Sequence, residues 1–243
     1  MFVQIKNLTK KFKNTFAVND INFDIEKNKT LGLLGPNGCG KTTSIGMMLG
    51  LIKPTSGQIF IDNKNLESFK RNDILARINF ASPYIELPKK LTVRQNLEVY
   101  GRLYGIENRK ERIEEISEDL NIKDFFHRKT GELSSGQKNR VSLAKSLINK
   151  PEILLLDEPT ASLDPDIGDF VRSYIQDYSS KNKVTILLAS HNMAEVERLC
   201  DSIIMMKSGK IIDRGTCNEI IDKHGRNNLE ETFLKLARSK DEF

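Results

Sequence analysis

Long hydrophobic runs are absent from this sequence. The longest apolar runs, such as Ile153–Leu156 and Ile203–Met206, are four residues long, whereas a helix needs roughly 20 apolar residues to span a bilayer. Residues 1–13 carry lysines through an alternating pattern and lack the apolar core of a signal peptide. We therefore expect neither a membrane-spanning nor a secreted protein.

Cysteine and excess charge are also scarce. Cys39, Cys200 and Cys217 form neither a disulfide framework nor a metal-spaced set, which fits a reducing cytosol. The 38 basic and 33 acidic residues leave a net charge of +5, too small to argue for a nucleic-acid partner. No repeat or low-complexity linker divides the 243 residues. The composition predicts one globular chain with a sizeable core.

Short strands alternate with helical patterns along most of the chain. Phe2–Lys6 and Ile21–Ile25 alternate like half-buried strands, and Thr30–Leu34 is an apolar run that stops at a glycine-rich loop. Ile153–Leu156 and Val184–Ala189 are further strands, each followed by a helical pattern. Such alternation predicts an α/β fold with a largely parallel sheet, whose ligands bind beyond the carboxyl ends of the strands.

The middle of the chain is predicted to be helical. Thr92 and Gln95 match a capping box, after which Val93, Leu97, Tyr100 and Tyr104 form one apolar stripe. Residues 107–120 have the pattern of an amphipathic helix with a solvated face. From Ser134 a third helix turns Val141, Ala144, Leu147 and Ile148 inward and ends before Pro151.

Residues Gly35 to Thr42 fit the pattern GxxxxGK[ST] at every fixed position. Glycines let the backbone wrap around a phosphate with its N–H groups pointing inward, and the following helix adds its positive end. Lys41 can reach the β- and γ-phosphates of a nucleotide, and the Thr42 hydroxyl can ligate Mg²⁺. The alternative is a glycine-rich turn with an exposed lysine.

A second candidate site follows the run Ile153–Leu156, which ends in Asp157 and Glu158. A buried strand delivers both carboxylates to the edge of the sheet, where acids are costly unless they are paired or metal-bound. Asp157 is placed to hold Mg²⁺, and Glu158 to orient or deprotonate a water that attacks the γ-phosphate. The alternative is a surface ion pair.

A third candidate site lies at Leu133–Gln137, where hydroxyls and a glycine begin a helix. The N–H groups of Ser135, Gly136 and Gln137 would be free to bind an anion. The alternative is an ordinary serine N-cap.

With these motifs the chain resembles the nucleotide-binding subunits of ABC transporters along nearly its whole length. Gly35–Thr43 resembles their Walker A motif, Leu133–Gln137 their signature, with Ser135 in place of the first glycine, and Asp157–Glu158 their Walker B motif with the catalytic glutamate. Ser162–Asp164 resembles the D-loop and His191 the switch histidine.

The resemblance assigns roles to single residues. Glu158, His191 and Lys41 would be catalytic, and Thr42 and Asp157 would bind Mg²⁺. The residues implied to contact ATP are Phe12, Gly35, Pro36, Asn37, Gly38, Cys39, Gly40, Lys41, Thr42, Thr43, Ser134, Ser135, Gly136, Gln137 and Asp164. Phe12 would stack on adenine, although it could instead belong to the core.

The resemblance also implies an architecture and partners. The expected fold is a single ABC ATPase domain over residues 1–243: a P-loop NTPase core, an N-terminal antiparallel part, a helical subdomain inserted at about 84–150 and a short helical tail at about 216–243. Two subunits would close head to tail around two ATPs and drive a separate permease from the cytoplasmic face of the membrane. The pattern is most like the ATPases of ABC-2-type exporters.

Two other functions stay open. One is a nucleotide-sensing ABC protein with weak hydrolysis, and the other is a soluble ABC ATPase acting on DNA or ribosomes. The second is disfavoured because only 95 residues (136 − 41) separate Lys41 from Gly136, with no heptad run between them.

One departure from the family favours the sensor. A glutamine normally follows the strand at Ile78–Phe80, but this chain has Ser82 or Pro83 there, and Glu86 is a distant substitute. We therefore expect slower hydrolysis or a different coupling to the partner.

Three further residues carry smaller expectations. His127 and His224 should be surface residues. Cys39 could be a redox switch if the loop N–H groups and Lys41 lower its thiol pKa, although a small side chain is all that the loop needs.

Overall fold

The computed structural model describes residues 1–68, 71–84 and 86–238. The chain divides into two compact units. One unit joins Met1–Leu75 to Thr185–Phe243, and the other is Ala76–Val184. Within the described residues, no helix is long and apolar enough to cross a membrane.

The first unit opens with an antiparallel sheet. It contains β1 (Val3–Phe12), β2 (Thr15–Ile25), β4 (Ser56–Ile61) and β5 (Lys64–Asn65) in the order β2-β1-β4-β5. Val3 pairs with both Ile25 and Ile61, so the alternating apolar residues of three strands share one buried face. The predicted strands are confirmed, but β1 and β2 continue into a lysine-rich hairpin beyond the predicted ends.

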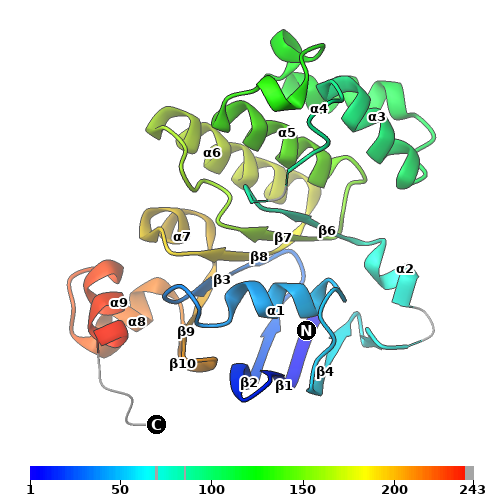
Figure 1. The fold of residues 1–243 in the computed structure, drawn as a ribbon. Helices are drawn as coiled ribbons and strands as arrows, with labels where there is room; N and C mark the ends of the chain where they lie inside the picture. The colour runs from blue at the N-terminus through cyan, green and yellow to red at the C-terminus, as the bar shows by residue number, and fades with distance from the viewer. Residues whose placement is uncertain (69–70, 85, 239–243) are drawn as a thin grey trace. The chain divides into compact units, whose positions relative to one another are not determined.

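A second set of strands in this unit is mostly parallel (Figure 1). The order is β10 (Lys210–Gly215), β9 (Ser202–Lys207), β3 (Thr30–Leu34) and β8 (Thr185–Ser190), with β3 parallel to both β8 and β9. All residues of β3 and β8 are buried, which explains why these strands read as continuous apolar runs in the sequence. The predicted α/β class, with its antiparallel N-terminal part and mainly parallel sheet, is confirmed.

Five helices in the described part of this unit surround these strands. Helix α1 (Lys41–Met48) follows the glycine-rich loop, α2 (Arg71–Leu75) closes the first segment, and α7 (Met193–Leu199) follows β8. The C-terminal helices α8 (Cys217–His224) and α9 (Leu229–Arg238) form the predicted tail, of which residues 239–243 lie outside the described part.

The tail packs against the core of its own unit. Its residues Ile220 and Leu229 share one buried cluster with Leu34 at the end of β3 and Val196 in α7. The prediction that His224 is a surface residue is wrong, because its side chain is only 17% exposed and its Nε2 lies 2.5 Å from Asp213 Oδ2. His127 is exposed, as expected.

In its described residues, the second unit combines two strands with four α-helices. Strands β6 (Ile78–Ala81) and β7 (Ile153–Asp157) are parallel neighbours. Figure 1 shows the helices gathered beside them. The helices are α3 (Val93–Leu103), α4 (Arg109–Asp119), α5 (Ser135–Leu147) and α6 (Pro165–Asn182), with short 3₁₀ turns η1 (Lys123–Phe125) and η2 (Thr130–Glu132).

Local sequence signals place these helices. The capping box of Thr92 and Gln95 is present at the start of α3, as predicted. The apolar stripe of α3 is buried only in its first half, because Tyr104 is 37% exposed. Arg112 of α4 is buried and donates to the carbonyl of Leu147 at 2.6 Å, which joins α4 to the end of α5.

Candidate functional site

The glycine-rich loop joins β3 to α1 in the first unit. Gly38 and Gly40 have φ of 80° and 111°, values that side-chain-bearing residues rarely adopt. A Cβ atom on Gly40 would lie 2.4 Å from the carbonyl oxygen of Ala17 in β2. The last glycine of the motif is therefore required both by the backbone turn and by a close approach of another strand.

Lys41 is held inside this loop. Its side chain is buried, and Nζ donates to the carbonyl oxygens of Gly35 at 2.6 Å and Pro36 at 3.4 Å. The first turn of α1 carries no acidic residue and no side-chain cap, so its N–H groups and the lysine present positive charge together. The alternative of an exposed lysine on a turn is therefore wrong, and the loop has the positive charge and the N–H groups that an anion would need.

The other loop residues differ in exposure. Asn37, Gly38 and Thr42 are exposed, whereas Pro36 and Thr43 are half-buried. The Thr42 hydroxyl in the first turn of α1 is thus within reach of a ligand that binds at the loop.

Cys39 does not fit a redox switch. Its side chain is 2% exposed, and burial raises the pKa of the thiol although Lys41 acts in the opposite direction. The hypothesis required a lowered pKa, so the structure contradicts it.

His191 emerges next to the loop in the same unit. Leu34 of β3 pairs with Ser190 of β8, so the glycine-rich loop and His191 both begin at the same edge of two parallel strands. His191 itself is exposed. Both motifs therefore lie beyond the carboxyl ends of parallel strands, where the sequence analysis expects ligands to bind.

A buried hydrogen-bond network, which sequence reasoning missed, holds the turn around His191. The Ser190 hydroxyl donates to Glu195 Oε2 at 2.6 Å and accepts from the Asn192 N–H at 3.1 Å. Asn192 in turn accepts from the Glu195 N–H at 3.3 Å, which caps α7. The available signal was an asparagine three residues before a glutamate, a pattern typical of a helix start.

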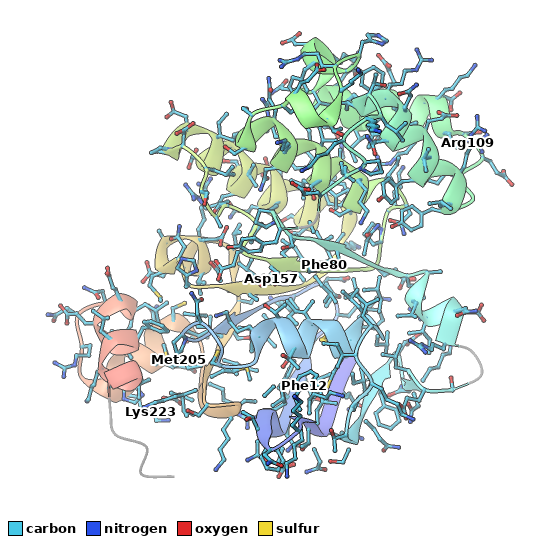
Figure 2. All side chains as sticks on the ribbon, in the orientation of Figure 1. Phe12, Phe80, Arg109, Asp157, Met205 and Lys223 are labelled. Atoms are coloured by element: carbon cyan, nitrogen blue, oxygen red, sulfur yellow. The ribbon has the colours of Figure 1, made fainter. Side chains whose placement is uncertain are left out.

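Phe12 is not a core residue. It ends β1 and is 48% exposed; Figure 2 labels it. The alternative that assigned it to the core is therefore wrong, and its ring is available to a ligand.

Asp157 ends the buried strand β7 of the second unit, and Glu158 follows it directly; Figure 2 labels Asp157. They are 4% and 8% exposed, so they are not a surface ion pair. Glu158 has φ of 55°. This backbone conformation is uncommon for a residue with a side chain and persists only where the surroundings impose it. The carboxylate is consequently held in a defined place.

The side-chain oxygen atoms of Asp157 and Thr42 are of a chemical type that suits Mg²⁺. The carboxylate of Asp157 and the hydroxyl of Thr42 are hard oxygen ligands, which Mg²⁺ prefers, and this ion usually takes few protein ligands together with phosphates and water. The described residues contain no cluster of three or more His, Cys, Asp or Glu that could hold a metal by itself.

The start of α5 differs from the prediction in one respect. Ser134 and Gln137 form a complete capping box, in which the Gln137 N–H donates to Ser134 Oγ at 3.3 Å. The prediction that the Gln137 N–H is free is therefore wrong. Of the three predicted anion donors, the N–H groups of Ser135 and Gly136 remain candidates.

The segment after β6 begins beside the two carboxylates. Ala81 pairs with Leu156, so Ser82 and Pro83 leave the same sheet edge as Asp157 and Glu158. Ser82 is buried and its Oγ accepts the Tyr84 N–H at 3.3 Å. Neither residue supplies an amide at this edge, in agreement with the predicted departure from the family.

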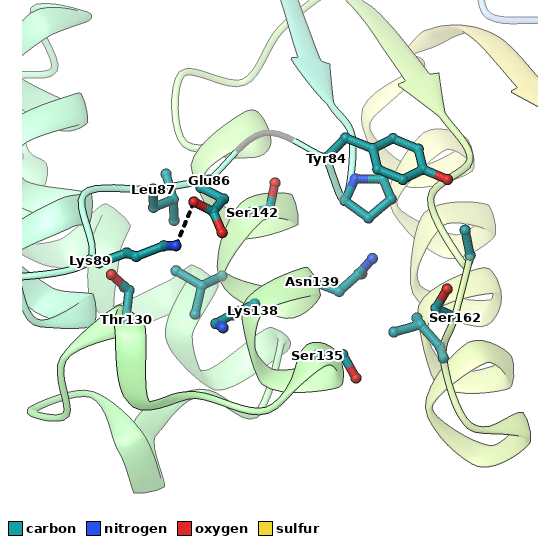
Figure 3. A pocket seen from close by; sticks show the side chains of 14 residues that line it. Tyr84, Glu86, Leu87, Lys89, Thr130, Ser135, Lys138, Asn139, Ser142 and Ser162 are labelled. Atoms are coloured by element: carbon teal, nitrogen blue, oxygen red, sulfur yellow. Dashed lines mark ion pairs between the residues drawn. The ribbon is translucent and has the colours of Figure 1, made fainter.

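Glu86 points elsewhere. It is exposed and forms an ion pair of 2.8 Å with Lys89 (Figure 3), and hydrogen bonding to Lys89 lowers the pKa of its carboxyl. Ile85, in the same segment, lies outside the described residues. The contacts of Glu86 therefore give no support to its substituting for the missing glutamine.

A cavity of about 290 Å³ lies between this segment, the start of α5 and the segment Ala161–Leu163 (Figure 3). Asn139 lines it and donates to the Pro159 carbonyl at 2.6 Å. This bond ties α5 to the residue that follows Glu158. Asp164, next in the chain, is exposed and precedes Pro165 at the start of α6.

Comparisons with known proteins find relatives along most of this chain. A family model described as ABC transporter matches residues 18–161. The chain is 37% identical over 227 residues to the ABC transporter ATP-binding protein NatA of Bacillus subtilis, with 91% of each chain covered. It is 34% identical to the Nod factor export ATP-binding protein I of Burkholderia lata, covering 90% of this chain and 72% of that protein.

A relative named for import is also similar. The xylose/arabinose import ATP-binding protein XacJ of Haloferax volcanii is 36% identical, covering 86% of this chain and 55% of that protein. Among solved structures, a dimeric post-hydrolysis state of the ATP-binding cassette MJ0796, bound to ADP and Pi, superposes with a TM-score of 0.81. It is 26% identical, and the match covers 88% of this chain and 98% of that one. The chain therefore belongs to the ABC transporter family as one of its ATP-binding subunits.

Proposed function

We propose that this ABC ATPase closes head to tail with a second copy of itself around two ATPs, and that hydrolysis drives a separate membrane permease in the direction of export. The observation that carries the proposal is the buried Glu158, held directly after Asp157 at the end of β7. A buried carboxylate next to a metal-binding carboxylate suits a water-activating base. A site that only bound nucleotide would have no need of it.

The first unit would bind the nucleotide. The N–H groups of Gly35–Gly40 and the α1 helix start would hold the phosphates, and Lys41 would exchange its bonds to the loop carbonyls for the β- and γ-phosphate oxygens. The exposed ring of Phe12 would stack on the adenine.

Hydrolysis would use the residues at the strand ends. Thr42 and Asp157 would hold Mg²⁺, which supplies charge that stabilises the transferring phosphoryl group. Glu158 would orient the attacking water and accept its proton, and His191 would contact the γ-phosphate. The network of Ser190 and Glu195 would keep the backbone at His191 in place.

The second copy would complete each site. The N–H groups of Ser135 and Gly136, fixed by the capping box beneath them, would bind the nucleotide held by the other copy. Asp164 would lie beside the same nucleotide. Because both sites need both copies, cleavage of ATP would release the contact and reopen the dimer, and this cycle would supply the work of transport.

The permease and the direction of transport are proposals. The helical segment at about 84–150 would contact the permease, which places the subunit on the cytoplasmic face of the membrane with no nucleic-acid partner. Export and the ABC-2 subclass are supported by the motif pattern and by the similarity to a Nod factor export protein.

A nucleotide sensor with weak hydrolysis is the second candidate. Ser82 and Pro83 favour it, since they begin beside Glu158 and provide no amide for the metal or the attacking water.

Glu158→Gln separates the two candidates. We expect the variant to bind ATP, to lose ATP turnover by about 10²- to 10⁴-fold, and to accumulate as an ATP-bound dimer in sedimentation experiments with the permease present. Glu230→Gln is the matched control, because Glu230 is exposed, lies outside the segment proposed to contact the permease and has no assigned role. Equal, near-zero turnover in the wild type and Glu158→Gln would support the sensor, and a strictly monomeric variant would exclude the ATP-bound dimer.

A further inference from the structure

A lysine covers one face of the Phe12 ring. Lys10 Nζ lies 4.9 Å from the ring centroid, within the range of a cation–π interaction. Residues two apart in a strand point to the same side, so the strand itself brings Lys10 and Phe12 together. Phe12 also pairs with Thr15 across the hairpin.

The ammonium of Lys10 is also held by a backbone carbonyl group. Its Nζ donates to the Lys53 carbonyl at 2.8 Å. Two further hydrogen bonds fix the segment that contains Lys53 and Thr55 to β1. The Thr55 N–H donates to the Thr9 carbonyl at 2.8 Å, and the Lys11 N–H donates to Thr55 Oγ1 at 3.0 Å. The Lys10 side chain is therefore held by a hydrogen bond to a segment that is itself fixed to β1, and it is not a freely rotating surface lysine.

The hairpin that carries Phe12 is also held against the glycine-rich loop of its own unit. The Asn19 N–H donates to the Gly209 carbonyl at 2.8 Å, and the Gly209 N–H donates to the Cys39 carbonyl at 3.1 Å. The ring and the phosphate-binding backbone thus belong to one connected framework, in which the orientation of Phe12 decides whether a base can stack while its phosphates reach the loop.

We propose that Lys10 is a positioning residue for nucleotide binding, whose ammonium occupies one face of the Phe12 ring and leaves the opposite face to a purine base. The proposal rests on the role proposed above for Phe12. A cation held over an exposed aromatic ring restricts its rotamers, so less freedom is lost when the base binds. The ring quadrupole attracts the cation on one face without blocking stacking on the other.

The test is to compare a ligand with a base and one without it. We expect Lys10→Met to weaken binding of ATP by about two- to fivefold, measured by calorimetry on the full chain, and to leave binding of inorganic tripolyphosphate unchanged. Lys10→Arg should restore ATP binding, because a guanidinium can both donate to the Lys53 carbonyl and lie over the ring.

The neighbouring lysine provides a matched control. Lys11 Nζ lies 4.9 Å from the ring of Phe16, so Lys11→Met removes the same charge and the same kind of contact one residue away. Lys11→Met should change neither the affinity for ATP nor the affinity for tripolyphosphate. If Lys10→Met weakened both ligands equally, or if Lys11→Met matched it, the effect would be one of net charge and the proposal would be overturned.

Phe12→Ala distinguishes this proposal from the one on which it rests. If that variant loses about tenfold in ATP affinity while Lys10→Met loses nothing, Phe12 binds the base and only the role of Lys10 is wrong. If Phe12→Ala leaves ATP affinity intact, the proposed function of Phe12 itself fails. Thermal midpoints of all variants confirm that the protein is folded.

Discussion

Replacing Gly40 by alanine should be much more harmful than the same change at Gly38, two residues earlier in the loop. Both glycines have positive φ, so alanine at either position adds about 1–2 kcal/mol of backbone strain to the folded state. At Gly38 the new Cβ meets nothing within 4 Å, whereas at Gly40 it would lie 2.4 Å from the Ala17 carbonyl oxygen. Relieving that overlap requires a backbone shift, which adds about 1–3 kcal/mol.

The two variants are compared by thermal unfolding. About 1 kcal/mol corresponds to roughly 2–4 °C in a chain of this length, so we expect the midpoint of Gly40→Ala to lie about 2–12 °C below that of Gly38→Ala. Its affinity for ATP should fall as well, because the shift moves the loop N–H groups. Coinciding midpoints, or a Gly40→Ala variant as stable as the wild type, would refute the steric argument.

Two further predictions concern the thiol in the loop and the turn after β8. Burial raises the pKa of the Cys39 thiol, so less thiolate is present at a given pH. Iodoacetamide at pH 8 should therefore label Cys39 more slowly in the native than in the unfolded protein, as measured by peptide mass spectrometry. Faster labelling of the native protein would restore the redox hypothesis. Ser190→Ala removes the 2.6 Å hydrogen bond to the buried Glu195, so it should cost about 1–3 kcal/mol of stability and lower kcat for ATP with little change in KM. A normal kcat would show that the turn at His191 does not depend on this network.

Local patterns identified most of the candidate site because each motif is short and contiguous. The loop that ends in Lys41 needs glycines at positions of positive φ, and the strand that ends in Asp157 reads as an apolar run because all of it is buried. The serine cap of α5 was recognised from its residue types. The prediction of three free N–H groups at the start of α5 was wrong for Gln137, because the sequence does not show that the Gln137 N–H donates to Ser134 Oγ.

Residues that act through distant partners were not predictable. Glu195 is a conventional first-turn acid of α7 in the sequence, and only the fold reveals that it is buried and bonded to Ser190. His224 was assigned to the surface because its partner Asp213 lies eleven positions away in another element.

The order of the motifs, their chemistry and the membership of a nucleotide-binding family follow from the sequence alone, since each depends on neighbouring residues. Tertiary structure decided which strand ends lie side by side, that Phe12 is exposed beneath Lys10, and that Ala17 requires a glycine at position 40. These features join residues far apart in the chain, and their energies arise only when packing brings the backbones within contact distance.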